Sequence, residues 1–300
     1  MTKPLSGMYA ALMTGLNDQG EFDVERQKTL TGYVINQGLR GLYVGGSSGE
    51  GGLLETAALL EQQAVVADCA KGSGQILMAH VGTPALADAI GLARNAKSLG
   101  YHALSALPPH SYPFSDDEIF GYYQALSQAT DLPVIVYEIP IRTNRPLPLD
   151  LLVRLLDLPN VAGIKFTSSD MFKLSMLRRR RPDSTYFFGF DEIFLSAAAL
   201  GVDGGIGTTY NLLGKLYVAL NQAVLAGDLA RAQALQDISQ RFVEVLLETG
   251  VLPGMKAAFR VIGIDCGPTR APMTVKVNDA EARMKAFLEL PDVAVWLARP

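Results

Sequence analysis

VIVYEIP at residues 134–140 and AGIKFTS at residues 162–168 are short, continuous apolar runs rich in β-branched side chains. Strands covered on both faces have this pattern, and neither run is long enough to suggest a helix. Further runs of the same kind recur every 20 to 35 residues or so, about the length of one strand plus one helix. They are MYAALMT (8–14), LYVGG (42–46), ILMAHVG (76–82), ALSALPP (103–109), YFFGF (186–190) and GGIGTTY (204–210).

Stretches with helical spacing separate these runs. Residues 24–38 are helical in pattern, and residues 55–72 and 84–100 place apolar side chains three and four positions apart and finish on glycine. Eight parallel strands with helical crossovers close naturally into an α/β fold, the (β/α)8 TIM barrel. The alternative is an open doubly wound sheet, which usually has fewer strands and a GxGxxG sequence after the first. The chain has no such sequence.

The residues after the last strand extend the barrel. Residues 213–250 are strongly helical in pattern, and further helices are expected from Pro253 to the end. No linker separates them from the barrel. We therefore expect a barrel core over residues 1–212 and a C-terminal helical extension over residues 213–300, packed together as a single structural unit.

Composition and charge limit the classes of function. The 300 residues are 49% hydrophobic and 19% charged, and the net charge of −4 argues against binding to nucleic acid or an anionic membrane. Two cysteines and three histidines, with no CxxC and no His/Cys cluster, predict neither a metal site nor a disulfide framework. The N-terminus has no signal-peptide pattern, and no window of about 20 residues is apolar enough to span a bilayer. We expect a cytoplasmic protein.

Lys165 lies inside one of the strand-like runs. Side chains alternate along a strand, so Ile164 and Phe166 should face the helices while Lys165 faces the barrel interior. A desolvated lysine has a lowered pKa, so part of it is the free amine that attacks a carbonyl. The alternative role is a structural salt bridge inside the barrel.

Tyr137 ends the preceding strand on the carboxyl side, where barrel enzymes place their sites. Neighbouring parallel strands lie about 4.8 Å apart, which brings Tyr137 and Lys165 within side-chain reach. The hydroxyl of Tyr137 could move protons to and from a carbinolamine. A tyrosine that merely packs at the barrel mouth is the alternative.

Glycine- and hydroxyl-rich segments follow two other strands. In GGSSGEG (45–51), backbone N–H groups and the hydroxyls of Ser47 and Ser48 can hold a carboxylate. The GK[ST] of a nucleotide loop is missing there. GGIGTTYN (204–211) adds more small and hydroxyl residues after the eighth strand.

An acidic pair follows the seventh strand. In GFDE (189–192), Asp191 and Glu192 are suited to hydrogen bonds with several hydroxyl groups of a polyol. Acids that favour a helix N-terminus are the alternative explanation.

Seven motifs recur in order over nearly the whole chain: YVGGSSGEG, AHVG, SYPFS, VYEIP, GIKFTSSD, GFDEIF and DGGIGTTYN. With them the chain resembles the N-acetylneuraminate lyase and dihydrodipicolinate synthase family of pyruvate-dependent class I aldolases. The resemblance implies that Lys165 forms a Schiff base, that Tyr137 shuttles protons, and that Ser47 and Ser48 hold the pyruvate carboxylate. The sialic acid lyases are the most similar members. In those lyases, a set of residues holds the hydroxyl-rich tail of the sugar. The resemblance implies the same role for the residues at the matching positions, which are Thr167, Gly189, Asp191, Glu192, Gly207 and Thr208.

Three departures from the lyase pattern concern the substrate. His110 and Ser111 replace a phenylalanine and a tyrosine, and that tyrosine ordinarily completes a proton relay in the neighbouring subunit. Arg142 stands where lyases have an aliphatic residue and dihydrodipicolinate synthases have a carboxylate-binding arginine. Glu138 replaces an asparagine or isoleucine. Together they suggest a pocket for a variant substrate, such as a sugar acid with a second carboxylate.

The resulting expectation is a carbon–carbon lyase that acts on a small 2-keto acid. The substrate that we expect first is N-acetylneuraminate, cleaved to N-acetylmannosamine and pyruvate. Condensation of pyruvate with aspartate semialdehyde, or cleavage or dehydration of a 2-keto-3-deoxy sugar acid, is the alternative. A non-catalytic keto-acid sensor is the alternative from another class. The resemblance further implies a homotetramer, and the lysine chemistry needs no metal or organic cofactor.

Overall fold

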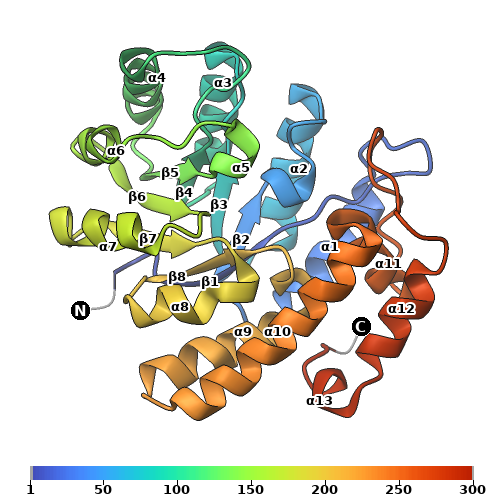
Figure 1. Cartoon of the computed structure of the whole chain (residues 1–300). Helices are drawn as coiled ribbons and strands as arrows, with labels where there is room; N and C mark the ends of the chain where they lie inside the picture. The colour runs from blue at the N-terminus through green and yellow to red at the C-terminus, as the bar shows by residue number, and fades with distance from the viewer. Residues whose placement is uncertain (1–2, 299–300) are drawn as a thin grey trace.

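Eight parallel strands form a closed barrel in which each strand pairs with the next along the chain and β8 pairs with β1 (Figure 1). This computed structural model describes residues 3–298. The strands are β1 (Gly7–Ala11), β2 (Gly41–Val44), β3 (Ile76–His80), β4 (Ala103–Ala106), β5 (Val134–Glu138), β6 (Val161–Phe166), β7 (Thr185–Phe188) and β8 (Gly204–Gly207). The predicted fold class is therefore confirmed. Each apolar run continues past the end of its strand into a loop at the barrel mouth.

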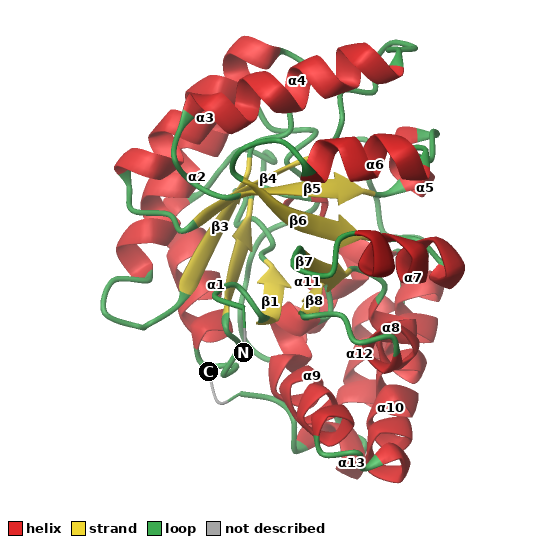
Figure 2. Ribbon diagram, turned by 90° about the vertical axis from the view of Figure 1, so that its left-hand side faces the viewer, coloured by secondary structure: helices red, strands yellow, loops and turns green. Residues whose placement is uncertain are grey.

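Helices surround the strands on the outside of the barrel (Figure 2). They are α1 (Val24–Ile35), α2 (Thr56–Cys69), α3 (Leu86–Ser98), α4 (Asp116–Ala129), α5 (Pro140–Thr143), α6 (Leu149–Leu156), α7 (Met171–Arg180), α8 (Phe194–Ala199) and α9 (Tyr210–Leu225). The three-residue helices η1 (Ser47–Gly49) and η2 (Asp191–Ile193) follow β2 and β7. Both of these short turns lie at the mouth of the barrel, where the polar motifs of the sequence are found.

Two separate apolar cores result from the alternation of side chains along the strands. Ile164 and Phe166 belong to the large core between strands and helices, whereas Tyr9, Tyr43 and Phe187 belong to the core inside the barrel. Lys165 faces this inner core, as the alternation predicts, because its ammonium group lies over the rings of two interior tyrosines.

Four more helices follow the barrel: α10 (Leu229–Thr249), α11 (Val251–Val261), α12 (Ala280–Leu288) and α13 (Pro291–Ala294), coloured orange to red in Figure 1. Helix α10 packs against α9, α8 and η2, and α11 contacts α1 through the edge-to-face rings of Phe259 and Tyr33. The position between residues 212 and 213 falls inside α9, which is the helix that follows β8. The helices that add to the barrel pattern are thus α10–α13.

The structure shows the role of the only run of four basic residues in the sequence. The four arginines at 178–181 close α7; Arg180 pairs with Asp150, Arg181 pairs with Asp157, and Arg178 donates to the carbonyl of Leu200. Cations at a helix C-terminus complement its dipole. Within residues 3–298, no helix has both the length and the apolar character that crossing a membrane requires.

Candidate active site

Lys165 and Tyr137 occupy matching positions on neighbouring strands, because β5 and β6 pair in a register that sets Tyr137 beside Lys165. The Nζ atom of Lys165 lies 4.1 Å from the ring centre of Tyr137 and 4.3 Å from that of Tyr43. Lys165 is only 3% exposed. The structure thus places a buried amine against two aromatic faces at the carboxyl end of the barrel.

Burial lowers the pKa of Lys165 below the ordinary value for a lysine. The nearby guanidinium of Arg142 acts in the same direction, whereas Tyr137 and Asp191 oppose the shift. A lower pKa increases the fraction of unprotonated amine near neutral pH, and only that form is a nucleophile. No carboxylate pairs with Lys165 among the described residues, which argues against the structural salt bridge.

His80 is a third ring in this cluster. Its ring centre lies 6.1 Å from that of Tyr137 and 5.9 Å from that of Tyr43. Its Nε2 atom accepts a hydrogen bond of 3.3 Å from the backbone N–H of Leu107, which joins the ends of β3 and β4. Burial and the charge of Lys165 lower the pKa of His80 to about 3, so the imidazole is neutral at ordinary pH. His80 belongs to the AHVG motif, but no local pattern in that motif predicts that its ring lies beside Tyr137.

A cavity of ≈ 410 Å³ opens in front of Lys165 and Tyr137. Hydroxyl and carboxyl groups from four different strand ends face it, and they are Ser47, Ser48, Thr167, Asp191, Glu192 and Thr208. The hydroxyls of Ser48 and Thr208 lie 2.6 Å apart and link the loops after β2 and β8. The cavity can therefore bind a ligand that carries one anionic end and several hydroxyl groups.

Asp191 is a buried polar group in this wall and is held by two hydrogen bonds from Thr209. Its Oδ2 atom accepts hydrogen bonds from the backbone N–H of Thr209 at 2.9 Å and from the Thr209 hydroxyl at 2.7 Å. Burial raises the pKa of Asp191 to about 6, although these hydrogen bonds oppose the shift. Its neighbour Glu192 is half-buried and lines the same cavity.

Gly189 and Gly207 provide space rather than contacts. A Cβ atom at Gly189 would lie 1.9 Å from Oγ1 of Thr167 and 3.3 Å from Cε of Lys165. A Cβ atom at Gly207 would lie 2.1 Å from Oδ1 of Asp191. Gly189 lines the cavity, whereas Gly207 lies behind Asp191 and is not part of the lining.

Arg142 lies on α5 at the rim of the cavity. Its side chain is exposed and has no ion-pair partner or hydrogen bond among the described residues. Together with Ser47 and Ile141, it also lines an adjoining cavity of ≈ 960 Å³. A free guanidinium is thus available where the two cavities meet.

Glu138 does not face the cavity, contrary to its grouping with the pocket residues. It follows Tyr137 on the same strand and so points outward, where it is fully buried. Its Oε1 atom lies 3.1 Å from Nζ of Lys173 and accepts a 3.1 Å hydrogen bond from the backbone N–H of Leu147. The side chain secures the segment between α5 and α6 against α7.

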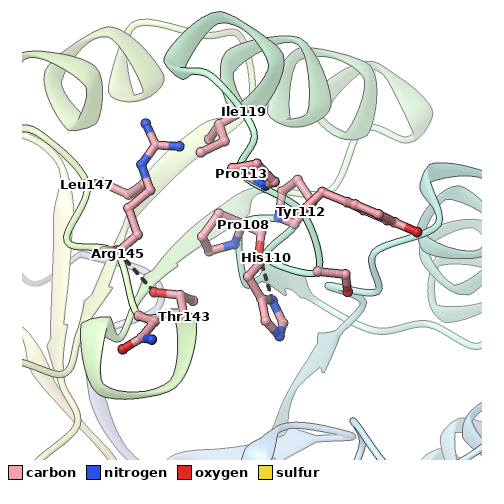
Figure 3. A pocket seen from close by; sticks show the side chains of 11 residues that line it. Pro108, His110, Tyr112, Pro113, Ile119, Thr143, Arg145 and Leu147 are labelled. Carbon is pink, nitrogen blue, oxygen red and sulfur yellow. Dashed lines mark hydrogen bonds between the residues drawn. The ribbon is translucent and has the colours of Figure 1, made fainter.

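His110 and Ser111 also lie outside the cavity in front of Lys165. Both line the adjoining cavity and a further one of ≈ 470 Å³ on the loop between β4 and α4 (Figure 3). The Nδ1 atom of His110 lies 3.2 Å from the carbonyl oxygen of Pro108. Tyr112 is 73% exposed, and Figure 3 shows its hydroxyl pointing away from Arg145. Within this chain, none of these groups reaches the cavity of Lys165.

The C-terminal helices close one side of the cavity, which the sequence did not predict. Val243, Leu246 and Leu247 from α10 and Val251 from α11 form an apolar wall opposite the polar loops. Their helical spacing indicated only an amphipathic helix, because nothing in a local pattern specifies which surface it covers. Among the described residues, no group of His, Cys, Asp and Glu side chains is arranged to hold a metal ion.

The closed barrel, the buried lysine at its carboxyl end and the hydroxyl-lined cavity in front of that lysine define a class I aldolase. The sequence pattern of the dihydrodipicolinate synthetase family matches residues 4–290. The chain belongs to this family.

Relatives with established names agree with this assignment. The chain is 42% identical over 279 residues to the N-acetylneuraminate lyase of Rhizobium meliloti, covering 92% of each chain. It is 41% identical over 265 residues to the N-acetylneuraminate lyase of Salmonella paratyphi B, covering 88% of this chain and 89% of the relative. Among solved structures, CdNal from Clostridium difficile in complex with mannosamine superimposes with a TM-score of 0.93 at 29% identity, covering 98% of this chain and 100% of that one. The N-acetylneuraminate lyase of Fusobacterium nucleatum gives 0.90 at 31% identity, covering 98% and 99%.

Proposed function

We propose that the protein is a lyase that cleaves N-acetylneuraminate to N-acetylmannosamine and pyruvate through an imine on Lys165. The observation that carries the proposal is the buried amine of Lys165, 4.1 Å from the ring centre of Tyr137, at the base of a hydroxyl-lined cavity. The names of the relatives support the choice of substrate.

The reaction uses the imine as an electron sink. The unprotonated Nζ of Lys165 adds to the C2 carbonyl of the keto acid, and loss of water from the carbinolamine leaves the imine. Tyr137 relays the proton of the C4 hydroxyl away as the C3–C4 bond breaks and its electron pair moves into the imine to form an enamine. C4 becomes the carbonyl carbon of the departing aldehyde. The enamine is then protonated at C3, and water releases pyruvate and free Lys165.

The remaining site residues divide between the two ends of the substrate. Ser47 and Ser48 would hold the carboxylate next to the imine. At the other end, the hydroxyl-rich tail would be bound by Thr167, Asp191, Glu192 and Thr208. Gly189 would leave the space that the tail needs, and Gly207 leaves room for the Asp191 carboxylate.

The proposal is tested by measuring the release of pyruvate from N-acetylneuraminate. Lactate dehydrogenase reduces the released pyruvate, and the loss of NADH reports the rate. We expect turnover by the wild type and none by K165R. Borohydride added with pyruvate should attach a stable three-carbon unit to Lys165. A folded protein that forms this adduct but releases no pyruvate from N-acetylneuraminate would contradict the substrate, whereas absence of the adduct would favour a non-catalytic sensor.

A second candidate function follows from the unpartnered guanidinium of Arg142. An arginine offers a bidentate fork to an acid group, so this position favours an aldehyde or sugar acid with a second carboxylate. Aspartate semialdehyde is such a partner, and so are 2-keto-3-deoxy sugar acids that carry a second carboxylate at the end remote from the keto group. Asp191 and Glu192 favour the sugar acids, because the semialdehyde has no polyol to bind.

Assembly, location and domain organisation are also proposed from the sequence and from the family. We propose a homotetramer in the cytoplasm, in which residues 1–212 and 213–300 act as one structural unit. Analytical ultracentrifugation, cell fractionation and the number of unfolding transitions would test these three statements.

A further inference from the structure

A chain of buried hydroxyl groups lies behind Asp191. The Thr209 hydroxyl, which bonds to Asp191, lies 2.6 Å from the hydroxyl of Tyr217 on α9. The Tyr217 hydroxyl in turn lies 2.7 Å from that of Ser239 on α10. Thr209, Tyr217 and Ser239 are each at most 2% exposed. The network therefore runs from the cavity wall into the helices outside the barrel.

Each hydroxyl group has a single proton to donate, and this determines the direction of the hydrogen bonds along the hydroxyl chain. An ionised carboxylate only accepts hydrogen bonds, so the single proton of the Thr209 hydroxyl points to Asp191. The Tyr217 hydroxyl must then donate to Thr209, which leaves its own oxygen to accept from Ser239. Donors aligned in this way polarise one another and strengthen the last bond, to Asp191.

Helix α10 also holds the main chain of Asp191. Nε2 of Gln236 donates to the carbonyl oxygen of Asp191 at 3.0 Å, and Oε1 of the same side chain accepts from the backbone N–H of Leu195 at 2.8 Å. The Ser239 hydroxyl also lies 3.1 Å from this carbonyl, but its single proton points to Tyr217, so Gln236 is the side chain that donates to the carbonyl. Because η2 is a single turn of three residues, it cannot fix Asp191 by its own backbone bonds alone.

We propose that Tyr217, Ser239 and Gln236 are positioning residues that hold the Asp191 carboxylate in place for the hydroxyl-rich end of the substrate. The C-terminal helices thereby set the affinity for the sugar tail independently of the imine chemistry. This inference rests on the proposed function, because it takes Asp191 as a group that binds the polyol.

The three side chains act through Asp191, because none of them lines the cavity. One carboxylate oxygen, Oδ2, is held by Thr209, whereas Oδ1 is buried without a hydrogen-bond partner among the described residues. An unsatisfied buried acceptor is costly, and a substrate hydroxyl would relieve that cost only if the carboxylate keeps its orientation. Loss of the hydroxyl chain formed by Thr209, Tyr217 and Ser239 should therefore weaken binding of the hydroxyl-rich end of the substrate alone.

The variants Y217F and S239A test the inference with two substrates. With N-acetylneuraminate we expect KM to rise about 3- to 10-fold while kcat changes less than about twofold, the pattern of lost uniform binding. With 4-hydroxy-2-oxopentanoate, a keto acid that has no polyol tail, both parameters should stay at wild-type values. The borohydride adduct of pyruvate should form at the wild-type rate.

Matched controls remove a buried hydroxyl elsewhere. Tyr101 donates to the carbonyl of Gln63 and Ser127 to that of Gln124, both remote from the cavity, so Y101F and S127A should leave all parameters unchanged. If Y217F does not fold, Q236M tests the inference in its place, because this substitution removes the hydrogen bond to the carbonyl oxygen of Asp191.

An unchanged KM for N-acetylneuraminate in Y217F and S239A would overturn the inference, and so would equal losses on both substrates. If the wild type cleaves another polyol-bearing keto acid but not N-acetylneuraminate, the proposed substrate is wrong and the same comparison is made with that keto acid. If the wild type cleaves no polyol-bearing keto acid, both statements are wrong.

Discussion

The Nζ atom of Lys165 lies 4.1 Å from the ring centre of Tyr137, and the two residues pair directly across strands β5 and β6. Their distance is set by the register of the sheet, not by a flexible loop. Sites built on strands are held more rigidly than sites on loops, so the amine and the proposed proton relay keep their relative position throughout a reaction.

Replacement of Tyr137 by phenylalanine should separate imine formation from bond cleavage. The aromatic face beside Lys165 is retained, so borohydride should still trap pyruvate on the lysine. Pyruvate release from N-acetylneuraminate should fall about 10²- to 10⁴-fold, the contribution typical of general acid–base catalysis. Equal turnover by Y137F and wild type would show that another group moves the proton.

The pKa of Asp191, raised to about 6, predicts an acidic limb that depends on the substrate. Below about pH 6 the carboxyl is protonated and loses acceptor capacity, so kcat/KM for N-acetylneuraminate should fall relative to that for 4-hydroxy-2-oxopentanoate. The ratio cancels protonation of Lys165, which affects both substrates. His80 does not contribute near this pH, because its pKa is lowered to about 3. A constant ratio between pH 5 and 8 would contradict the role of Asp191.

Replacement of Arg142 by leucine should distinguish the two candidate substrates. If the unpartnered guanidinium binds a second carboxylate, acid-bearing partners such as aspartate semialdehyde should lose about 10- to 100-fold in kcat/KM. N-acetylneuraminate cleavage should change little. Acid-bearing substrates that lose no efficiency in R142L would show that Arg142 has no such role.

Replacement of Gly189 by alanine should disturb the site directly. The new Cβ would lie 1.9 Å from Oγ1 of Thr167, a β-branched side chain with few alternative rotamers. We expect a loss of about 1–3 kcal/mol in the free energy of unfolding, together with slower trapping of pyruvate on Lys165. Gly32 on α1 has open space around it, so G32A is the control and should be neutral or slightly stabilising.

The buried ion pair between Glu50 and Lys256 should stabilise the loop that carries Ser48. The charged atoms are 3.1 Å apart, both side chains are at most 1% exposed, and Glu50 also accepts a 2.6 Å hydrogen bond from the backbone N–H of Arg270. K256M should lower the free energy of unfolding by about 3–5 kcal/mol and weaken pyruvate binding. Denaturant titration and the KM for pyruvate trapping measure both effects.

Two further variants interpret that result. The neutral double variant E50Q/K256M should recover part of the lost stability, because it leaves no unpaired buried charge. K71M breaks the exposed pair with Asp68 and should leave stability unchanged. If K256M behaves like K71M, the buried pair does not support the loop.

The barrel and the face of Lys165 could be predicted because both follow from the two-residue period of strands. Eight apolar runs specified eight strands, and the alternation around Lys165 left one inward direction. The same rule could have excluded Glu138 from the pocket, since an inward Tyr137 requires an outward neighbour. Glu138 departs from the family pattern, and this suggested a role in the pocket. Its side chain points out of the barrel, so it has no such role.

The support for the site could not be predicted, because it depends on contacts between residues far apart in sequence. No local pattern shows that Lys256 pairs with Glu50 or that Leu246 lines the cavity in front of Lys165. The hydroxyl chain behind Asp191 joins η2, α9 and α10, and its members look like ordinary helical residues. Long-range packing decides such contacts, and amphipathic spacing gives only the face that is buried.

The position of α10 in the chain has a consequence for protein synthesis. A chain emerging from the ribosome contains Lys165, Tyr137 and Ser48 well before residues 229–249 exist, and domains generally begin to fold from their N-terminal part. Such a nascent chain already carries the reactive amine but has neither the apolar wall nor the helix that holds Asp191. The pocket is therefore completed only near the end of translation, and an incomplete chain cannot present a finished site to keto acids in its surroundings.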